Sequence, residues 1–446
     1  MAKREDACDA GGQWSRALLA GMRAGAWCLS ALALGGCSGD DPVQQGRPIE
    51  GCEQFSYNYC DIRTPKCQSD LFQLVGCLRG EDLAGAGPPP VSVLSEADAT
   101  AMVLEQSDTP AAEPDADADF SARVRGLELL GLVDPGLIAS QSDVVDVTIE
   151  AVAAFYQPTT RSVVIIDRGD PLDDSDADAV LAHEFVHAWQ DRRHDLNSFG
   201  DEPDLDSDRT LALNAVVEGE AMVYQLLLML AYRGVDLKQA NYSGMWQSLV
   251  TQGEELASAE GSPMVTAPGI FPYTYGARYM GEHWLDGSHE ELDSIFEQPP
   301  ASSLEVMLDS SGASMPVIEP FDVMPSPLDG YRHVVDDVAG AWVVFSRLLD
   351  LSGSAYADSL RDLSTHWRGD RFWVYQTEDD QRDTAVVWWI DWSDAISAVR
   401  AAEMIASAAR PAAAQIEVQG SRLSVVVSER GPDLSSWTKR AADGAP

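Results

Sequence analysis

Residues 179–191 read AVLAHEFVHAWQD and place His183 and His187 four positions apart in a largely apolar run. Residues four apart lie one turn above each other on a helix, so both imidazoles point the same way, and Glu184 borders that face. The preceding residues 175–178, Ser-Asp-Ala-Asp, are typical of a capping box at a helix start. We therefore expect one helix from residue 175 to about residue 191 with three polar side chains close together.

Those three side chains need polar partners if the helix is buried. A single histidine on an apolar helix is more often a hydrogen-bonded core residue than a ligand. Two histidines one turn apart beside a glutamate favour a metal site, because His-Glu-x-x-His places two imidazoles on a zinc ion and a carboxylate next to it. The pattern predicts Zn²⁺ as the cofactor, His183 and His187 as ligands, and Glu184 as the general base.

A catalytic zinc has three protein ligands and leaves one position for water, so a further ligand is required. His194 is the nearest candidate in the sequence. It does not fit the metzincin pattern, because Gln190 and Arg193 stand where that pattern needs glycine and histidine.

A better candidate lies in residues 211–233, an apolar stretch interrupted by Glu218-Gly219-Glu220. The two glutamates lie about 200° apart around a helix, so only one of them can face the ion. A glycine inside a helix costs about 1 kcal/mol relative to alanine and indicates the close approach of another backbone. We expect that neighbour of Gly219 to be the helix that carries the two histidines.

The stretch Glu218 to Ala221 resembles the Glu-Gly-x-Ala motif of the gluzincins, the metallopeptidases that include thermolysin and the zinc aminopeptidases. The resemblance implies a zinc site made of His183, His187 and Glu218, with Glu184 as the base. A strand next to the cleft that can pair with an extended substrate is also implied.

The thermolysin-type pattern has an aspartate where Met222 stands in this chain. The partner that orients the histidines therefore has to be another residue, and Asp191, Gln190 and Glu220 are the candidates. Glu220 is equally well explained as a surface acid.

From about residue 156 to residue 405 the chain is also similar to a largely uncharacterised family of bacterial secreted proteins and lipoproteins. The matching motifs, in order, are Phe155-Tyr156, His183 to Asp191, Glu218 to Ala221, Phe271 to Gly276, Pro299 to Ser302 and Trp367 to Arg371. Several gluzincins place a tyrosine hydroxyl opposite the zinc, and this resemblance makes Tyr273 a candidate catalytic residue ahead of Tyr275. Packing is the alternative for both. We interpret Trp367 to Arg371 as a structural turn in which Asp370 pairs with Arg371; substrate binding is the alternative.

The amino-terminal segment indicates export. Residues 24–34 form an apolar run that follows Arg23. The run leads into Leu34-Gly35-Gly36-Cys37, which resembles a bacterial lipobox. This apolar run is too short to span a bilayer and is typical of a signal segment. We expect residues 1–36 to be removed and Cys37 to carry lipid, which anchors the protein to a membrane of the bacterial cell envelope.

Four further cysteines, Cys52, Cys60, Cys67 and Cys77, lie close together after Cys37. An even number in a short exported segment predicts two disulfides, with three possible pairings. Zinc binding by these four is the alternative, which the lack of a Cys-x-x-Cys pair disfavours.

The formal net charge of −42 excludes one class of partner, because nucleic acid would be repelled. We expect a peptide or protein substrate and no nucleic acid. Acidic clusters at residues 167–178 and 201–208 are interpreted as solvated loops rather than calcium sites, since neither follows the EF-hand spacing.

The fold class expected is α+β, a mainly helical zincin-like domain with a small amino-terminal hairpin or sheet and a small carboxy-terminal sheet. The hairpin is predicted at residues 153–157 and 162–166. Further helices are predicted at residues 275–285, 289–296, 336–351 and 394–408, and strands at residues 372–376, 385–390, 416–419 and 423–428. The organisation expected is a signal segment at 1–36, a tether at 37–50, a disulfide-stapled module at 51–80, an acidic Pro/Ala-rich linker with a short amphipathic piece at 81–119, a catalytic region at 120–430 and a tail at 431–446.

These features predict a lipid-anchored zinc metallopeptidase. The alternative is a cell-surface binding or assembly protein that keeps zinc for stability. The two differ in whether the fourth zinc position is open.

Overall fold

The computed structural model describes residues 48–106, 116–169, 171–200, 202, 205–308, 321, 324–325, 330–378, 383–407 and 413–429. The predicted signal segment, Cys37 and the tail lie outside the described residues. The elements, in chain order, are α3 (Pro65–Leu78), β1 (Val91–Ser95), α4 (Glu96–Gln106), α5 (Ala116–Leu130), α6 (Gln141–Ala151), β2 (Ala154–Gln157), β3 (Ser162–Asp167), α7 (Ser175–His194), α8 (Ser207–Tyr232), η1 (Leu237–Gln239), α9 (Tyr242–Glu260), α10 (Pro263–Phe271), η2 (Pro272–Gly276), α11 (Ala277–Glu297), α12 (Ser303–Leu308), β4 (Tyr331–Asp337), α13 (Ala341–Ser352), η3 (Ser354–Tyr356), α14 (Ala357–Ser364), β5 (Trp367–Thr377), β6 (Thr384–Trp392), α15 (Ala395–Ser407), β7 (Ala413–Gln419) and β8 (Arg422–Ser428).

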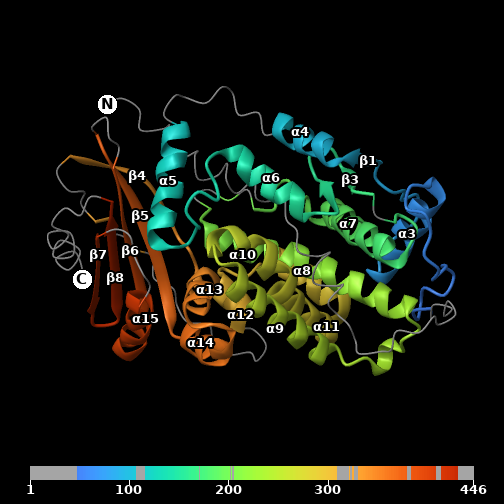
Figure 1. Ribbon diagram of the computed structural model, residues 1–446. Helices are drawn as coiled ribbons and strands as arrows, with labels where there is room; N and C mark the ends of the chain where they lie inside the picture. Colours follow the sequence, from blue (N-terminus) through green and yellow to red (C-terminus); the bar gives the residue numbers. More distant parts are fainter. Residues whose placement is uncertain are drawn as a thin grey trace, which may run out of the picture.

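The protein has an α+β fold, as the sequence predicts, with a helical body between two sheets (Figure 1). The predicted hairpin is present as β2 and β3, which pair antiparallel. A third strand, β1, lies parallel to β3 on its other side, so β2 is an edge of this sheet. The amphipathic piece of the predicted linker thus supplies a strand and the helix α4.

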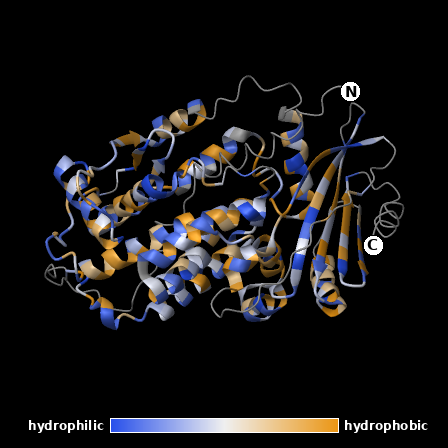
Figure 2. Ribbon diagram, turned by 180° about the vertical axis from the view of Figure 1, so that it is seen from behind, coloured by the Kyte–Doolittle hydropathy of each residue, from blue (hydrophilic) through white to orange (hydrophobic). Residues whose placement is uncertain are grey.

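The second sheet is antiparallel, in the order β4-β5-β6-β8-β7. One face packs against α5 and α15 and joins the main core, and the strands there are rich in hydrophobic residues (Figure 2). The other face carries an aromatic cluster that includes Trp373, Tyr375 and Trp389. Alternate residues of a strand point to opposite faces, which is why one strand serves both clusters.

Helix α7 begins one residue earlier than a capping box at residues 175–178 requires. The carboxylate of Asp174 accepts the backbone N–H groups of Asp176 and Ala177 and caps the helix. Asp178 does not cap it, because its carboxylate instead accepts the N–H of Cys60 and the hydroxyl of Tyr232.

Helix α8 forms the centre of the body, in contact with α7, η2 and α11. Among the described residues it is the one helix long and apolar enough to cross a membrane by length and composition. Most of its residues are buried inside the protein.

Three local predictions are wrong. Residues 277–297 form one helix, α11, because Gly287 keeps a helical conformation and does not end it. Residues 331–337 form strand β4, and a helix begins only at Ala341, because Gly340 has a φ of 89° that a helix does not allow.

The Trp367 to Arg371 motif belongs to strand β5 rather than to a turn. Asp370 is buried and does not pair with Arg371. Its carboxylate accepts the backbone N–H groups of Ala339 and Gly340 and the indole N–H of Trp388. Asp370 therefore fixes the start of α13 against the sheet.

The two predicted disulfides are present, and the pairing is Cys52–Cys77 and Cys60–Cys67. They link α3 to the segment before it. Helix α3 packs directly on α7, where the rings of Phe72 and Trp189 stack with centroids 4.6 Å apart. The indole N–H of Trp189 also donates to the backbone carbonyl oxygen of Phe72. The residues of this segment belong to the main hydrophobic core.

Candidate metal centre

Three side chains that were predicted as zinc ligands come together between α7 and α8. Ligand atoms of His183, His187 and Glu218 all lie within 4.8 Å of one another. Oε2 of Glu218 is 3.0 Å from Nε2 of His183 and 3.4 Å from Nε2 of His187. The two imidazoles meet edge to face, with centroids 4.8 Å apart.

The outer nitrogens of both imidazoles are held by glutamine amides. Nδ1 of His183 lies 3.0 Å from Oε1 of Gln225, and Nδ1 of His187 lies 2.8 Å from Oε1 of Gln190. An amide oxygen only accepts hydrogen bonds, so each neutral imidazole keeps its proton on Nδ1 and directs the lone pair of Nε2 toward Glu218.

A metal ion would join these two lone pairs to the carboxylate. Without one, burial lowers the pKa of His187 but Glu218 outweighs this and raises it to about 9, so an imidazole proton takes that place. Two histidines and a glutamate are the donor set of catalytic zinc sites. Hydrogen bonds that fix the imidazole tautomer are also a regular feature of zinc centres. The residues present therefore fit a zinc ion.

Electrostatics separate the two glutamates of the site. Burial raises the pKa of Glu184, and the nearby imidazoles offset this only in part. Burial also favours the neutral form of Glu218, but His187 and His183 together outweigh it and lower its pKa. Glu218 is thus suited to remain an anionic ligand, and Glu184 is the stronger base.

The general-base candidate is oriented by the edge strand of the small sheet. The backbone N–H of Tyr156 in β2 hydrogen-bonds the buried carboxylate of Glu184. The hydroxyl of Tyr156 donates to Asp191 at 2.9 Å, which ties β2 to the last turn of α7. Asp191 was one candidate for orienting a histidine, but it contacts Tyr156 instead. Gln190, another candidate, is the residue that contacts His187.

Glu220 is buried and is not a surface acid. Its Oε2 accepts the amide N–H of Gln190 at 2.8 Å, and its Oε1 accepts two N–H groups of Arg79 at 2.8 and 3.0 Å. Glu220 therefore acts on the site only through Gln190, as its position about 200° from Glu218 on the helix suggests.

The neighbour of Gly219 is not α7. A Cβ at Gly219 would lie 2.4 Å from the backbone oxygen of Gly276, in the π-helical turn η2. Helix α7 approaches the opposite side of α8, where Glu218 and Gln225 face it. The glycine therefore accommodates η2, which carries Tyr273.

Replacing Gly219 with alanine should destabilise the protein by about 1–3 kcal/mol, because the new methyl overlaps a backbone that cannot rotate away. The gain in helix propensity, about 1 kcal/mol, offsets only part of this. A matched control is Gly87→Ala, since a Cβ there meets nothing within 4 Å. Thermal unfolding of both variants measures the effect. Equal midpoints for the two variants would show that η2 does not press on α8.

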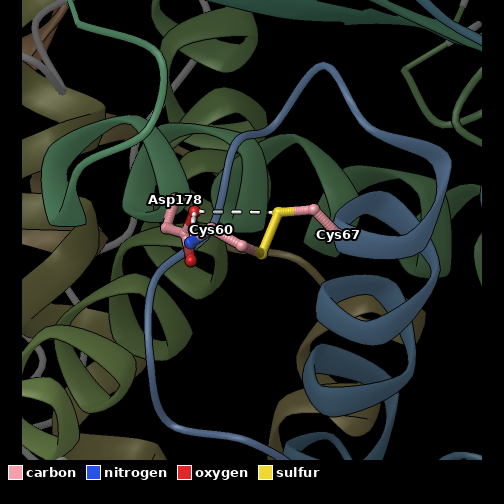
Figure 3. Close-up of side chains that lie close together, drawn as sticks. All are labelled: Cys60, Cys67 and Asp178. Carbon is pink, nitrogen blue, oxygen red and sulfur yellow. Dashed lines mark hydrogen bonds between the residues drawn. A yellow bond between two sulfur atoms is a disulfide. The ribbon is translucent and has the colours of Figure 1, made fainter.

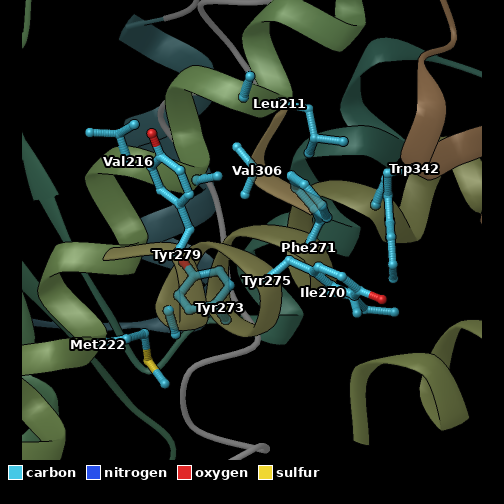
Figure 4. Packing of buried hydrophobic residues seen from close by; sticks show 14 of the residues in the cluster. Leu211, Val216, Met222, Ile270, Phe271, Tyr273, Tyr275, Tyr279, Val306 and Trp342 are labelled. Atoms are coloured by element: carbon cyan, nitrogen blue, oxygen red, sulfur yellow. The ribbon is translucent and has the colours of Figure 1, made fainter. Parts of the chain in front are cut away.

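The two tyrosines of η2 are separated by the fold. Tyr273 lies next to the site, with its ring stacked 6.0 Å from that of His183. Tyr275 points into the core, where its hydroxyl donates to Glu254 at 2.7 Å. Figure 4 shows both rings packed among residues of α8 and its neighbours. A catalytic role for Tyr273 stays a prediction.

Two other groups that raised the possibility of metal binding are explained by structure. Cys60, Cys67 and Asp178 lie together (Figure 3), but the two sulfurs are joined in a disulfide and offer no thiolate. His194 contacts Asp293 and stacks on Phe296.

The acidic clusters are only partly solvated. Asp178 and Asp208 are buried, and burial raises the pKa of Asp178 to about 6. Asp208 accepts the backbone N–H of Ser303 and so joins α8 to α12. These two acids stabilise contacts between helices.

Two residues of the site were missed in the sequence. Gln225 is a polar residue in an otherwise apolar run. It lies seven residues after Glu218 and therefore on the same face of α8, where it contacts His183. That spacing is a usable signal. Arg79 is separated from Glu220 by 141 positions, and no local pattern connects them.

Comparison with known proteins adds one family match. Residues 302–440 match a family described as "Domain of unknown function (DUF8575)". No curated protein and no solved structure matches the chain. The matched region begins beyond α8. It therefore does not include His183, His187 or Glu218.

Proposed function

We propose that the protein is a zinc-dependent metallopeptidase of the gluzincin type, in which His183, His187 and Glu218 hold the metal. One observation carries this proposal. Within the described residues, the group around His183 has three members, His183, His187 and Glu218, which is the number of protein ligands that a catalytic zinc uses.

The chemistry assigned to each residue follows from its contacts. A bound zinc ion supplies Lewis acidity, which makes water a better nucleophile and polarises a peptide carbonyl. Glu184 takes the proton from the attacking water and delivers it to the leaving amine. The N–H of Tyr156 holds one orientation of that carboxylate. Gln190 and Gln225 keep the imidazoles in the tautomer that binds metal.

Tyr273 is retained as the candidate hydroxyl donor to the carbonyl oxygen, on the basis of its position beside His183. Export and lipid attachment at Cys37 are part of the same proposal. The two disulfides support it, because such bonds persist in oxidising compartments outside the cytoplasm.

The low exposure of the site favours a second candidate, a surface protein that keeps zinc for stability. His183, Glu184 and His187 are each only 6–7% exposed. Little of these three side chains is therefore exposed to a substrate carbonyl.

Metal removal separates the two candidates. The peptidase proposal expects that a peptide library derived from a whole proteome is cleaved by the native protein, that chelation abolishes cleavage, and that added zinc restores it. Mass spectrometry of the products measures this. A protein that binds zinc and loses thermal stability on chelation, yet cleaves nothing, would support the structural role instead.

A further inference from the structure

A buried chain of hydrogen bonds connects the metal centre to the carboxy-terminal end of α3, the helix held by the two disulfides. It runs from His187 through Gln190 and Glu220 to Arg79. Each link between neighbours is 2.8 Å, and Gln190, Glu220 and Arg79 are at most 3% exposed. Water therefore competes little with any of these contacts.

Gln190 is the link whose orientation matters most. Its amide N–H₂ group donates to Glu220 and, at 2.9 Å, to the backbone oxygen of Val217. Both partners are acceptors. A flipped amide would turn its oxygen toward two other oxygens and its hydrogens toward Nδ1 of His187. The position of Glu220 thus keeps the amide oxygen on His187, and with it the tautomer that leaves Nε2 free for a metal.

Glu220 in turn depends on Arg79. A buried carboxylate without a cationic partner is costly and tends to move toward water. Arg79 supplies two N–H groups to Oε1 of Glu220 and a third to Glu81, at 2.7 Å. The planar guanidinium directs its N–H groups to both carboxylates in one fixed geometry, whereas an ammonium is a single point of charge without that fork.

Arg79 is itself placed by the disulfide-linked segment. It is the C-cap of α3, two residues after Cys77, which is bonded to Cys52. Helix α3 packs closely on α7, and this fixes the distance between the two helices. A Cβ at Gly76 would lie 2.5 Å from the ring of Trp189. The guanidinium therefore reaches Glu220 at a defined point.

We infer that Arg79 is a positioning residue of the metal centre: by holding Glu220 it fixes the amide of Gln190, and so presents His187 to the metal. This inference rests on the proposed zinc site. It assigns the disulfide-linked segment a part in metal binding, in addition to any contribution to stability.

The test is the zinc dissociation constant of the full mature chain, measured by competition with a chromophoric chelator. Arg79→Met should raise the constant by about ten- to hundredfold, as expected for loss of a group that orients a ligand through hydrogen bonds. Arg79→Lys should raise it less, because the charge remains. In the Arg79→Met background, Glu220→Gln should add no further loss, since the neutral amide oxygen still accepts from Gln190 and no buried charge is left unpaired.

A purely structural role for Arg79 predicts a different result, and a matched variant reveals it. Arg192 of α7 also contacts α3, because its guanidinium lies over the rings of Phe72 and Trp189. Among the described residues, its contacts include no member of the chain of hydrogen bonds. Arg192→Met should leave zinc affinity unchanged. Circular dichroism of the metal-free variants checks that each is folded. If Arg79→Met does not fold, the lysine and double variants carry the test.

A folded Arg79→Met protein with native zinc affinity would overturn the inference, and so would an equal loss in Arg192→Met. If Arg79→Met does not fold, native zinc affinity in the double variant or in Arg79→Lys would overturn it equally. Failure of the proposed zinc site looks different, because the native protein itself would then bind no zinc.

Discussion

Replacing Glu184 with glutamine is expected to lower peptide hydrolysis by about 10²- to 10⁴-fold, the usual contribution of a general base. Zinc should remain bound, because Glu184 is not a member of the ligand group. Glutamine has the same shape and keeps an oxygen that accepts the N–H of Tyr156, so the local structure should persist. What is lost is the carboxylate that accepts a proton. Turnover of a library peptide, measured together with zinc content, tests the role.

A second buried glutamate provides the control. Glu254 is also buried and accepts the hydroxyl of Tyr275, but it lies in the core away from the ligands. Glu254→Gln should lower the thermal unfolding midpoint and leave turnover per folded molecule unchanged. Native turnover in Glu184→Gln, or an equal loss in both variants, would contradict the role given to Glu184.

The second large effect concerns the two glutamates of α8. Glu218→Gln should weaken zinc binding strongly, because it replaces an anionic ligand by a neutral amide that zinc sites rarely use. Glu220→Gln should keep the metal bound and cost at most about ten- to hundredfold in affinity, since Glu220 contacts only Gln190 and Arg79. Zinc content after dialysis against a chelator measures both. Zinc lost from Glu220→Gln but kept in Glu218→Gln would reverse the assignment.

Local pattern was enough to predict the elements that carry the site. The spacing of His183 and His187 predicts one turn of a helix, and α7 has that turn. The interruption of an apolar run by Glu218 predicts a polar group that needs partners, and the structure brings Glu218 to the two imidazoles. Such signals are local because helix geometry fixes which residues share a face.

Contacts between distant segments could not be predicted in the same way. Gly219 does indicate a close neighbour, but its neighbour is Gly276 of η2, and nothing in the spacing distinguishes η2 from α7. The residues before Ala341 look helical by composition, yet pairing with β5 makes them a strand. Tertiary packing decides in such cases, and a single sequence does not contain it.

X-ray absorption at the zinc edge, on the native protein loaded with one equivalent of zinc, tests the central claim most directly. The proposed site predicts nitrogen and oxygen ligands at about 2.0–2.2 Å, with the outer scattering of two imidazoles and no sulfur. Sulfur at about 2.3 Å would place the metal on cysteines instead. Either that result, or a zinc shell without imidazole, would contradict a metal centre built from His183, His187 and Glu218.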